Sequence, residues 1–305
     1  MIQENTQANG YKAGFVNIIG KPNVGKSTLM NELLGEKLSI VSYKAQTTRH
    51  RIIGVLSGAN YQIVFSDTPG IIQSPSYVLH EIMLNTIKEA FEDADILVLV
   101  LDAQNDDNQQ IDTKILPMLE KRQVPLFVLL NKIDKVKEAE IPPKIAFWKA
   151  KLAPEVILPI SALYKQNTQG LIPLLVEYLP QHPAYYPEDT LTDRTVRFLA
   201  SEIIREKIFL LYEQELPYCC EVVIDEFKEK PTITVIRAII LTERDSQRKI
   251  MIGKDGSMLK KLGIQARQDL EHFLGVKVFL SLYVKVESNW RKRTDKLKKL
   301  GYLNS

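Results

Sequence analysis

The sequence predicts an α/β domain with a mostly parallel sheet, followed by a smaller α+β domain. Short apolar runs alternate with amphipathic segments between residues 15 and 179. The run at 96–101 contains no polar residue, which indicates a strand covered on both faces, as in parallel sheets. Three prolines at 180–187 then interrupt this alternation, and a second set of helices and strands follows.

We place the first domain at residues 11–180, a linker at 181–190 and the second domain at 191–305. Each domain is large enough to bury a core of its own. In the first domain, strands are predicted at 15–19, 52–56, 61–66, 96–101, 126–130 and 156–160, and helices at 27–34, 76–92, 108–122, 142–152 and 169–178. In the second domain, helices are predicted at 193–213 and 257–273, and strands at 218–224, 233–241 and 276–286.

A glycine-rich loop with the pattern G-x-x-x-x-G-K-S follows the first strand and precedes a helix. This is the context in which the pattern binds phosphates, because the glycines let several backbone N–H groups point at one phosphate chain. The helix N-terminus adds its positive dipole end. We expect Lys26 to reach the β- and γ-phosphates and Ser27 to bind Mg²⁺. The predicted nucleotide contacts in this loop are Gly20, Lys21, Pro22, Asn23, Val24, Gly25, Lys26, Ser27 and Thr28.

A D-x-x-G sequence follows the strand at 61–66. Asp67 is expected to hold Mg²⁺ through a water molecule, and the Gly70 N–H to sense the γ-phosphate. Thr47 and Thr48 precede this loop, and either hydroxyl could complete the Mg²⁺ coordination; we favour Thr48. The predicted nucleotide contacts of the loop are Asp67, Thr68, Pro69, Gly70 and Ile71, and the predicted catalytic residues are Lys26, Thr48 and Gly70.

The sequence N-K-x-D follows the strand at 126–130 and indicates the nucleotide base. The Asp134 carboxylate can accept two hydrogen bonds from the edge of guanine, whereas adenine has no donor at either position. Asn131 is expected to tie this loop to the glycine-rich loop, and Lys132 to lay its stem across the base. After the strand at 156–160, a backbone N–H of Ser161 or Ala162 is expected to donate to guanine O6. Together these motifs predict a binding site for GTP and GDP.

The second domain contains the sequence I-x-I-G-x-x-G between two predicted helices, which is the signature of KH domains. The loop of such domains clamps about four nucleotides of single-stranded nucleic acid. Residues 244–305 carry 15 basic and 6 acidic side chains, a net charge of +9, although the whole chain has a net charge of +3. The basic end therefore favours an anionic partner. RNA contacts are predicted for Arg248, Lys249, Ile252, Gly253, Lys254, Asp255, Gly256, Lys260 and Lys261.

The composition gives little support for a disulfide framework, a histidine or cysteine metal site, or a membrane span. The two cysteines are adjacent, at Cys219 and Cys220, so both are expected to act as small hydrophobic residues in a strand. The four histidines are scattered without metal-ligand spacing. The longest apolar run is too short to span a bilayer, and residues 1–9 do not resemble a signal peptide, so a cytoplasmic protein is expected.

The motif order of the first domain resembles the TRAFAC class of GTPases, and Thr47-Thr48-Arg49 resembles the branch that contains Era and MnmE. Ras-like relatives carry a glutamine after D-x-x-G that orients the attacking water, whereas this chain has Ile71, so intrinsic hydrolysis should be slow. Asn23 matches an asparagine that binds K⁺ in relatives of this branch. The alternative for Asn23, a turn residue after Pro22, stays open.

The order of elements in the second domain resembles the type II KH arrangement, and nearly the whole chain resembles the Era family of GTPases. The matching stretches include 46–50, 243–263 and 284–286 with Trp290 and Arg291, which the resemblance adds to the RNA-binding residues. The resemblance implies a GTP-switched factor for assembly of the 30S ribosomal subunit that binds the 3′ end of 16S rRNA. It also implies peripheral association with the inner membrane; a monomer is our default expectation.

The sequence leaves two other interpretations to consider. One is a KH-type RNA-binding module whose nucleotide site is largely structural. The other is an RNA-modifying enzyme like MnmE, which needs additional catalytic machinery for which this chain has no spare segment.

Overall fold

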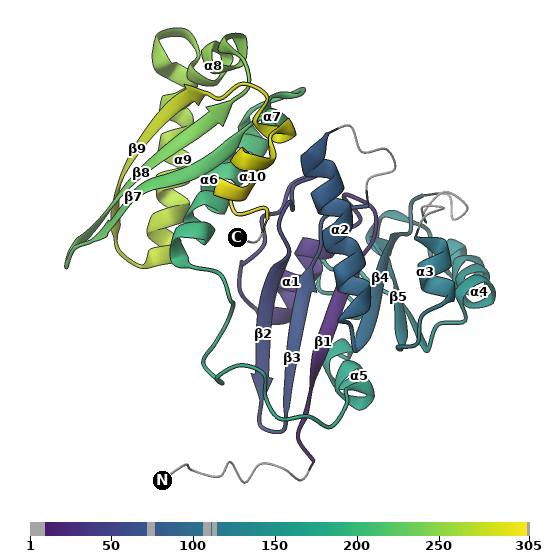
Figure 1. Cartoon of the computed structure of the whole chain (residues 1–305). Helices are drawn as coiled ribbons and strands as arrows, with labels where there is room; N and C mark the ends of the chain where they lie inside the picture. The colour runs from purple at the N-terminus through teal and green to yellow at the C-terminus, as the bar shows by residue number, and fades with distance from the viewer. Residues whose placement is uncertain (1–9, 72–76, 106–110, 112–114, 304–305) are drawn as a thin grey trace, which may run out of the picture. The chain divides into compact units, whose positions relative to one another are not determined.

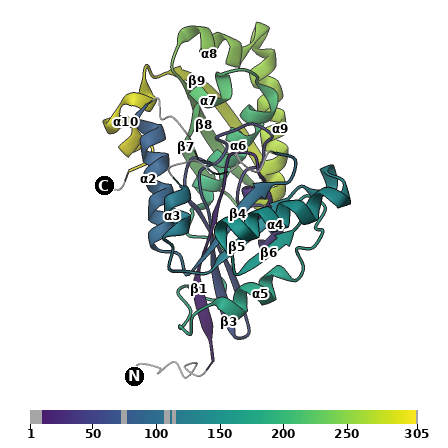
Figure 2. The same ribbon diagram turned by 90° about the vertical axis from the view of Figure 1, so that its right-hand side faces the viewer.

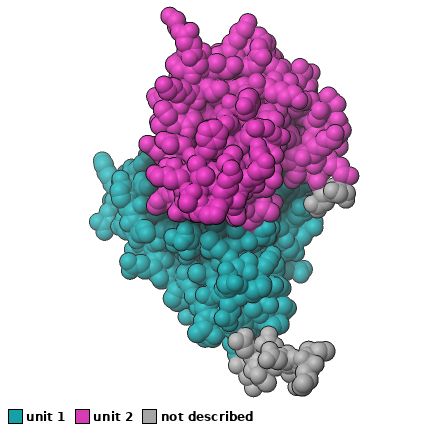
Figure 3. Space-filling model, turned by 90° about the vertical axis from the view of Figure 1, so that its left-hand side faces the viewer, with its two compact units in different colours: residues 1–39, 48–74, 83–193 teal, residues 40–47, 75–82, 194–305 magenta. Residues whose placement is uncertain are grey.

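The structure of the chain, a computed structural model, describes residues 10–71, 77–105, 111 and 115–303, and it divides into two compact units (Figures 1 and 3). Unit 1 consists of residues 1–39, 48–74 and 83–193, and unit 2 of residues 40–47, 75–82 and 194–305. Two short segments from the first half of the sequence, 40–47 and 75–82, thus group with the C-terminal region.

Unit 1 is built on a six-stranded sheet with the order β2-β3-β1-β4-β5-β6 (Figures 1 and 2). Only the β2–β3 pairing is antiparallel, as the mostly parallel prediction requires. The strands are β1 (Lys12–Ile19), β2 (Ile52–Gly58), β3 (Tyr61–Asp67), β4 (Ile96–Asp102), β5 (Leu126–Asn131) and β6 (Val156–Pro159). Every residue of β4 is buried, because helices cover both faces of the sheet.

The helices of unit 1 are α1 (Lys26–Leu34), α2 (Val78–Glu92), α3 (Leu116–Glu120), α4 (Ile141–Leu152) and α5 (Leu171–Tyr178). Ile87 of α2 and Trp148 of α4 pack on one face of the sheet with apolar residues of β4 and β5. On the opposite face, Phe127 of β5 packs edge-on against Tyr178 of α5. The N-terminal part of the helix predicted at 108–122 falls largely on residues 106–110 and 112–114, outside the described residues.

The expected linker packs along unit 1. The Val55 N–H of β2 donates to Leu191 O at 2.8 Å, and the Thr192 hydroxyl donates to Ile53 O at 2.6 Å. The Gln62 side chain accepts from the N–H groups of Tyr185 and Tyr186. These contacts explain why unit 1 extends to residue 193.

Unit 2 contains a three-stranded sheet with the order β7-β8-β9, in which β7–β8 is antiparallel and β8–β9 parallel. Its strands are β7 (Glu221–Glu229), β8 (Ile233–Thr242) and β9 (Lys277–Val286). The helices are α6 (Val196–Leu211), α7 (Leu216–Cys219), α8 (Asp245–Ile252), α9 (Ser257–Leu274) and α10 (Thr294–Lys299). Helices α6 and α9 bury their apolar stripes against one face of the sheet.

The strand predicted from residue 218 begins later than expected. Leu216–Cys219 forms the short helix α7, with Pro217 in its first turn, where proline is tolerated because that N–H has no helical partner. Cys219 and Cys220 are both buried, as expected for small hydrophobic residues, although Cys219 ends α7 and Cys220 caps it, so neither lies in the predicted strand.

Candidate nucleotide and RNA sites

The glycine-rich loop has the backbone geometry of a phosphate-binding loop. Gly25, at φ +102°, precedes α1, and a Cβ on it would lie 2.2 Å from Nδ2 of Asn131. That Asn131 nitrogen donates to Val24 O at 2.7 Å, so the N-K-x-D loop is tied to the glycine-rich loop as expected. Asn23 is exposed and left-handed, at φ +64°.

The three predicted Mg²⁺ ligands lie together. The Ser27 hydroxyl donates to Asp67 Oδ2 at 2.6 Å, the Thr48 hydroxyl donates to the same oxygen at 3.2 Å, and the two hydroxyl oxygens are 3.0 Å apart. Thr47 turns away, and its hydroxyl donates to Lys44 O. The other carboxylate oxygen of Asp67 is buried and has no hydrogen-bond partner among the described residues, and a bound cation or its water would satisfy it. Oxygen ligands of this kind suit Mg²⁺.

Lys26 is buried beside this cluster. Its ammonium donates to Gly20 O and Lys21 O, each at 3.0 Å. Burial lowers the pKa of Lys26 to about 8, and the Asp67 carboxylate opposes this shift. Burial likewise raises the pKa of Asp67, against the effect of Lys26 and the neighbouring hydroxyls. A negatively charged phosphate chain would favour the charged form of Lys26.

The D-x-x-G loop contacts the glycine-rich loop closely. A Cβ on Gly70 would lie 2.7–2.9 Å from atoms of Pro22, so only glycine fits here. The Ile71 N–H donates to Gly20 O at 3.3 Å, and the Thr68 hydroxyl donates to Ile18 O. The Ile71 side chain is buried, so it offers no polar group to orient water.

The residues predicted to recognise the base are also held in place. The Ser161 hydroxyl donates to Asp134 Oδ1 at 2.5 Å, which fixes an exposed carboxylate. The Lys132 ammonium pairs with Asp102 Oδ2 at 2.6 Å. Asp102 was missed in the sequence, although it ends β4 as Asp67 ends β3, and this common position could have identified it.

The N–H groups expected to meet guanine O6 are engaged within the protein. The Ser161 N–H donates to Gln166 O at 3.0 Å, and the Ala162 N–H donates to Asn131 Oδ1 at 2.9 Å. An O6 contact therefore requires one of these N–H groups to share or exchange its acceptor.

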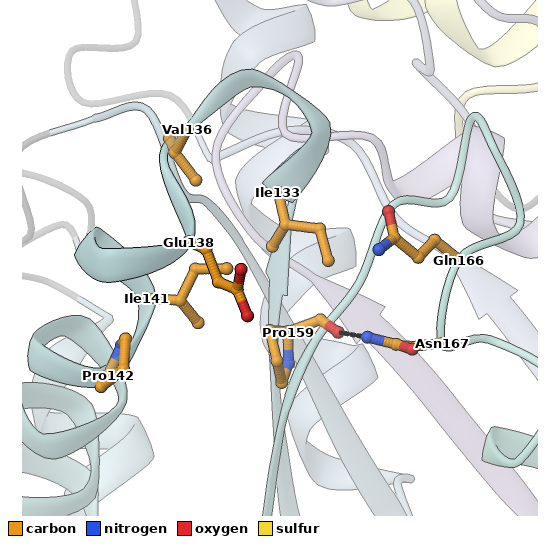
Figure 4. Close-up of a pocket in the computed structure, with 8 residues that line it drawn as sticks. All are labelled: Ile133, Val136, Glu138, Ile141, Pro142, Pro159, Gln166 and Asn167. Carbon is orange, nitrogen blue, oxygen red and sulfur yellow. Dashed lines mark hydrogen bonds between the residues drawn. The ribbon is translucent and has the colours of Figure 1, made fainter.

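A pocket of about 420 Å³ lies beside the base-recognition loop (Figure 4). Its lining is mostly apolar, with one carboxylate and two amides, and it includes none of the predicted nucleotide contacts. The lining residues are Ile133, Val136, Glu138, Ile141, Pro142, Pro159, Gln166 and Asn167.

The G-x-x-G loop of unit 2 joins α8 to α9 through a 3₁₀ turn at Lys254–Gly256. Gly253 and Gly256 have φ of +74° and +75°, and Asp255 is also left-handed. A Cβ on Gly253 would lie 2.8 Å from the side chain of Met258, whereas Gly256 faces open space. The loop thus exposes its backbone and the Lys254 side chain.

A groove of about 410 Å³ continues from this loop between α9 and β9. Its floor is apolar and its rim is basic, which suits unstacked bases and a phosphate backbone. Gly256 and Lys260 were expected here; the lining also includes Leu259, Gly263, Ile264, Arg267, Leu280 and Leu282. Helical spacing from Gly256 could have indicated Gly263 and Arg267, but the contribution of β9 requires the tertiary fold.

The remaining predicted RNA contacts are placed differently. Arg248 and Lys249 pair with Asp245 and remain partly exposed. Trp290 is fully buried and its indole N–H donates to Cys219 O, so its expected RNA contact is corrected to a packing role. Arg291 is mostly buried against Glu243.

The described residues contain no cluster of three or more histidine, cysteine or acidic side chains that could hold a metal ion. Within the same residues, no helix is both long enough and apolar enough to cross a membrane.

Comparison with known proteins gives two matching families. Residues 15–132 match a family described as "50S ribosome-binding GTPase", and residues 215–291 match the KH domain. GTPase Era of Syntrophus aciditrophicus is 44% identical over 96% of this chain and 95% of the relative. GTPase Era of Heliobacterium modesticaldum is 42% identical over 95% of this chain and 97% of the relative.

Two solved structures cover 96% of the chain at 40% identity, and the chain covers both completely. One is Era in complex with MgGDPNP and nucleotides 1506–1542 of 16S ribosomal RNA, with a TM-score of 0.92. The other is a variant of Aquifex aeolicus Era bound to GDP and AlF₄⁻, with a TM-score of 0.90.

Proposed function

Since the chain belongs to the Era family of GTPases, we propose that it binds the 3′ end of 16S rRNA through its KH domain and acts as a GTP-driven switch in assembly of the 30S subunit. The chain binds and hydrolyses GTP as a member of that family. The observation that carries the RNA assignment is the groove between α9 and β9, in a chain that matches an RNA-bound relative along 96% of its length.

Each residue near the phosphates has a proposed role. Lys26 binds the β- and γ-phosphates, and Ser27, Thr48 and Asp67 hold Mg²⁺, which neutralises charge on the phosphates. The Gly70 N–H binds the γ-phosphate. Because Ile71 cannot position water, hydrolysis is slow unless another group supplies this function. Asn23 supplies a ligand for K⁺, which would add positive charge near the phosphates.

The segment before Thr48 gives a physical route from GTP to the RNA-binding unit. Within unit 2, the Val41 N–H donates to Glu206 of α6 at 3.0 Å, and Arg205 Nη2 donates to Thr47 O at 2.5 Å. The Lys44 ammonium donates to the carbonyls of residues 209 and 212 at the C-terminus of α6. A cation there satisfies carbonyls that lack helical partners and complements the helix dipole.

A second segment, after the D-x-x-G loop, lies against the first, since the His80 ring is 3.2 Å from the Gln46 side-chain oxygen, and it also contacts Arg291. Tyr77 stacks beneath the Arg291 guanidinium, 4.4 Å from the ring centroid, and its hydroxyl accepts a hydrogen bond from Arg291. Arg291 also pairs with Glu243, two residues before α8. In the proposed switch, GTP orders both segments and hydrolysis releases them, which changes the α6 and α8 contacts that support the RNA groove.

Family membership supports two further parts of the proposal, a cytoplasmic location and a peripheral contact with the inner membrane. A monomer stays the default expectation.

The test is GTP turnover in K⁺ and in Na⁺, with and without an RNA that carries the 3′ end of 16S rRNA. We expect faster turnover in K⁺ and stimulation by the RNA. The variant Lys254→Asp/Lys260→Asp should lose RNA binding and stimulation but keep its basal turnover, because both side chains are exposed. Absence of RNA binding by the wild-type chain would refute the proposal.

A further inference from the structure

The sheet of unit 2 has a second face that α6 and α9 do not cover; the C-terminal segment reaches one end of it, where the Tyr302 hydroxyl donates to Glu221. Residues of even number in β9, such as Leu280 and Leu282, pack toward the core and line the RNA groove. Residues of odd number point to the other side, because side chains alternate along a strand. Among these, Phe279 and Tyr283 are 57% and 55% exposed.

The two exposed rings belong to an apolar surface that crosses the sheet. Phe279 pairs with Val235 in β8, and Tyr283 pairs with Ile239, which itself pairs with Val223 in β7. These five residues, the outer-face cluster, are absent from the core packed under α6 and α9. The spacing of four residues puts the two rings about 13 Å apart along one strand.

The charge around the outer-face cluster differs between its β9 side and its β7 side. Lys277 and Lys285 lie on the same side of β9 as the rings, one beyond each ring, and both are exposed. Acidic groups lie on the β7 side, where Asp225 and Glu226 pair with Arg237. A polyanion is therefore favoured along β9 and disfavoured along β7.

Strand β9 is also one of the two edge strands of the sheet, as Figure 1 shows. One of its faces lines the RNA groove and the other carries the rings, so only the width of a strand separates the two surfaces. An RNA strand that leaves the groove at this edge meets the outer face directly. Exposed aromatic rings with flanking lysines are a common platform for single-stranded bases.

We propose that the outer-face cluster is a second contact surface for RNA, on which Phe279 and Tyr283 stack bases of the strand that continues from the KH groove. This inference rests on the proposed function. It adds the requirement that the RNA be long enough to extend beyond the groove. A short RNA fills the groove alone, whereas a longer one also reaches the rings.

The test measures affinities of the full chain for fluorescent single-stranded RNAs that end at the 16S rRNA 3′ terminus and range from about 6 to 20 nucleotides. In Phe279→Ala/Tyr283→Ala, the affinity for the shortest RNA that binds the wild type should stay within twofold. The affinity for the longest should fall about 5- to 150-fold per lost stack. Phe279→Trp/Tyr283→Trp should retain the wild-type affinity for the longest RNA, whereas Phe279→Leu/Tyr283→Leu should lose it. Leu210→Ala, which removes an exposed apolar residue of α6, is the matched control.

The outcomes separate the two proposals. If the alanine variant binds long RNA as tightly as the wild type, the inference is wrong and the face serves another partner such as a protein. The proposed function then stands, provided that Lys254→Asp/Lys260→Asp still abolishes binding. If leucine restores affinity as well as tryptophan, stacking is refuted. If the wild type binds none of these RNAs, both proposals fail.

Discussion

Arg205 joins the segment before Thr48 to α6, and its replacement tests the proposed coupling. Its side chain is 1% exposed and makes two hydrogen bonds to Glu202, at 2.7 and 2.6 Å, besides the bond to Thr47 O. Arg205→Met alone would leave the Glu202 carboxylate buried without its partner. That change should destabilise unit 2 by about 3–5 kcal/mol, which would obscure any effect on function.

The informative variant is Glu202→Met/Arg205→Met, which removes both buried charges together. Its stability should lie much closer to that of the wild type, because replacing a buried pair by apolar side chains is often neutral. It still lacks the charged hydrogen bond to Thr47 O, worth about 1.5–3 kcal/mol. The equilibrium between the held and released segment should therefore shift by roughly 10- to 150-fold. Stimulation of GTP turnover by RNA should fall by up to that factor.

The assay is GTP turnover with and without saturating RNA, together with urea unfolding of each variant. Arg197→Met is the matched control, because Arg197 also lies on α6 but donates to carbonyls of residues 224 and 225, away from the segment. The reasoning is refuted if the double variant is folded and RNA still stimulates its turnover as in the wild type.

Three other predictions follow from single side chains. Asp134→Asn should weaken GTP binding by at least about 100-fold and favour xanthosine triphosphate, measured by competition; unchanged GTP selectivity would remove Asp134 from base recognition. Lys26→Ala should lower turnover by about 10²- to 10³-fold in single-turnover assays, and normal turnover would contradict its role. Burial raises the pKa of Tyr212, whose hydroxyl donates to Met251 O, so its contribution to stability is present below pH 10, the ordinary tyrosine pKa, and is lost above it. Tyr212→Phe should be about 1 kcal/mol less stable at pH 8, and that gap should shrink by about 1.4 kcal/mol per unit above pH 10 in urea unfolding; a constant gap would be inconsistent with this assignment.

Much of the nucleotide site could be predicted because its residues follow buried strands. Asp67 and Asn131 each end a strand of the parallel sheet, so their common edge was foreseeable. The sequence motif favours Thr48 over Thr47, but only the fold shows that the Thr48 hydroxyl faces Asp67 while the Thr47 hydroxyl donates to Lys44 O. The path of residues 181–193 could not be predicted either. An irregular segment has no hydrophobic periodicity, and contacts that its backbone makes with β2 do not depend on residue type.

The RNA side was harder to predict for a different reason. Trp290 and Arg291 stand in a basic stretch, and a tryptophan among cations suggests a surface for bases; yet the ring fills the core of unit 2 and the guanidinium is held by Glu243. Local charge does not show that both of these adjacent side chains are largely buried within unit 2. The groove residues of β9 could not be predicted either. The alternation of side chains along the strand indicates two faces, but it does not show which face packs toward α9.

The contacts of α6 suggest why the two functions share one chain. Its C-terminal carbonyls accept from Lys44, and the next residue, Tyr212, bonds to Met251 at the end of α8, just before Gly253 of the RNA loop. Only a few side chains therefore separate the segment that ends at Thr48 from the backbone that clamps RNA. A helix end has carbonyls without helical partners, and a single lysine can satisfy or release them at small cost. Such a connection suits a switch, because it is strong enough to hold a segment and weak enough for GTP hydrolysis to break.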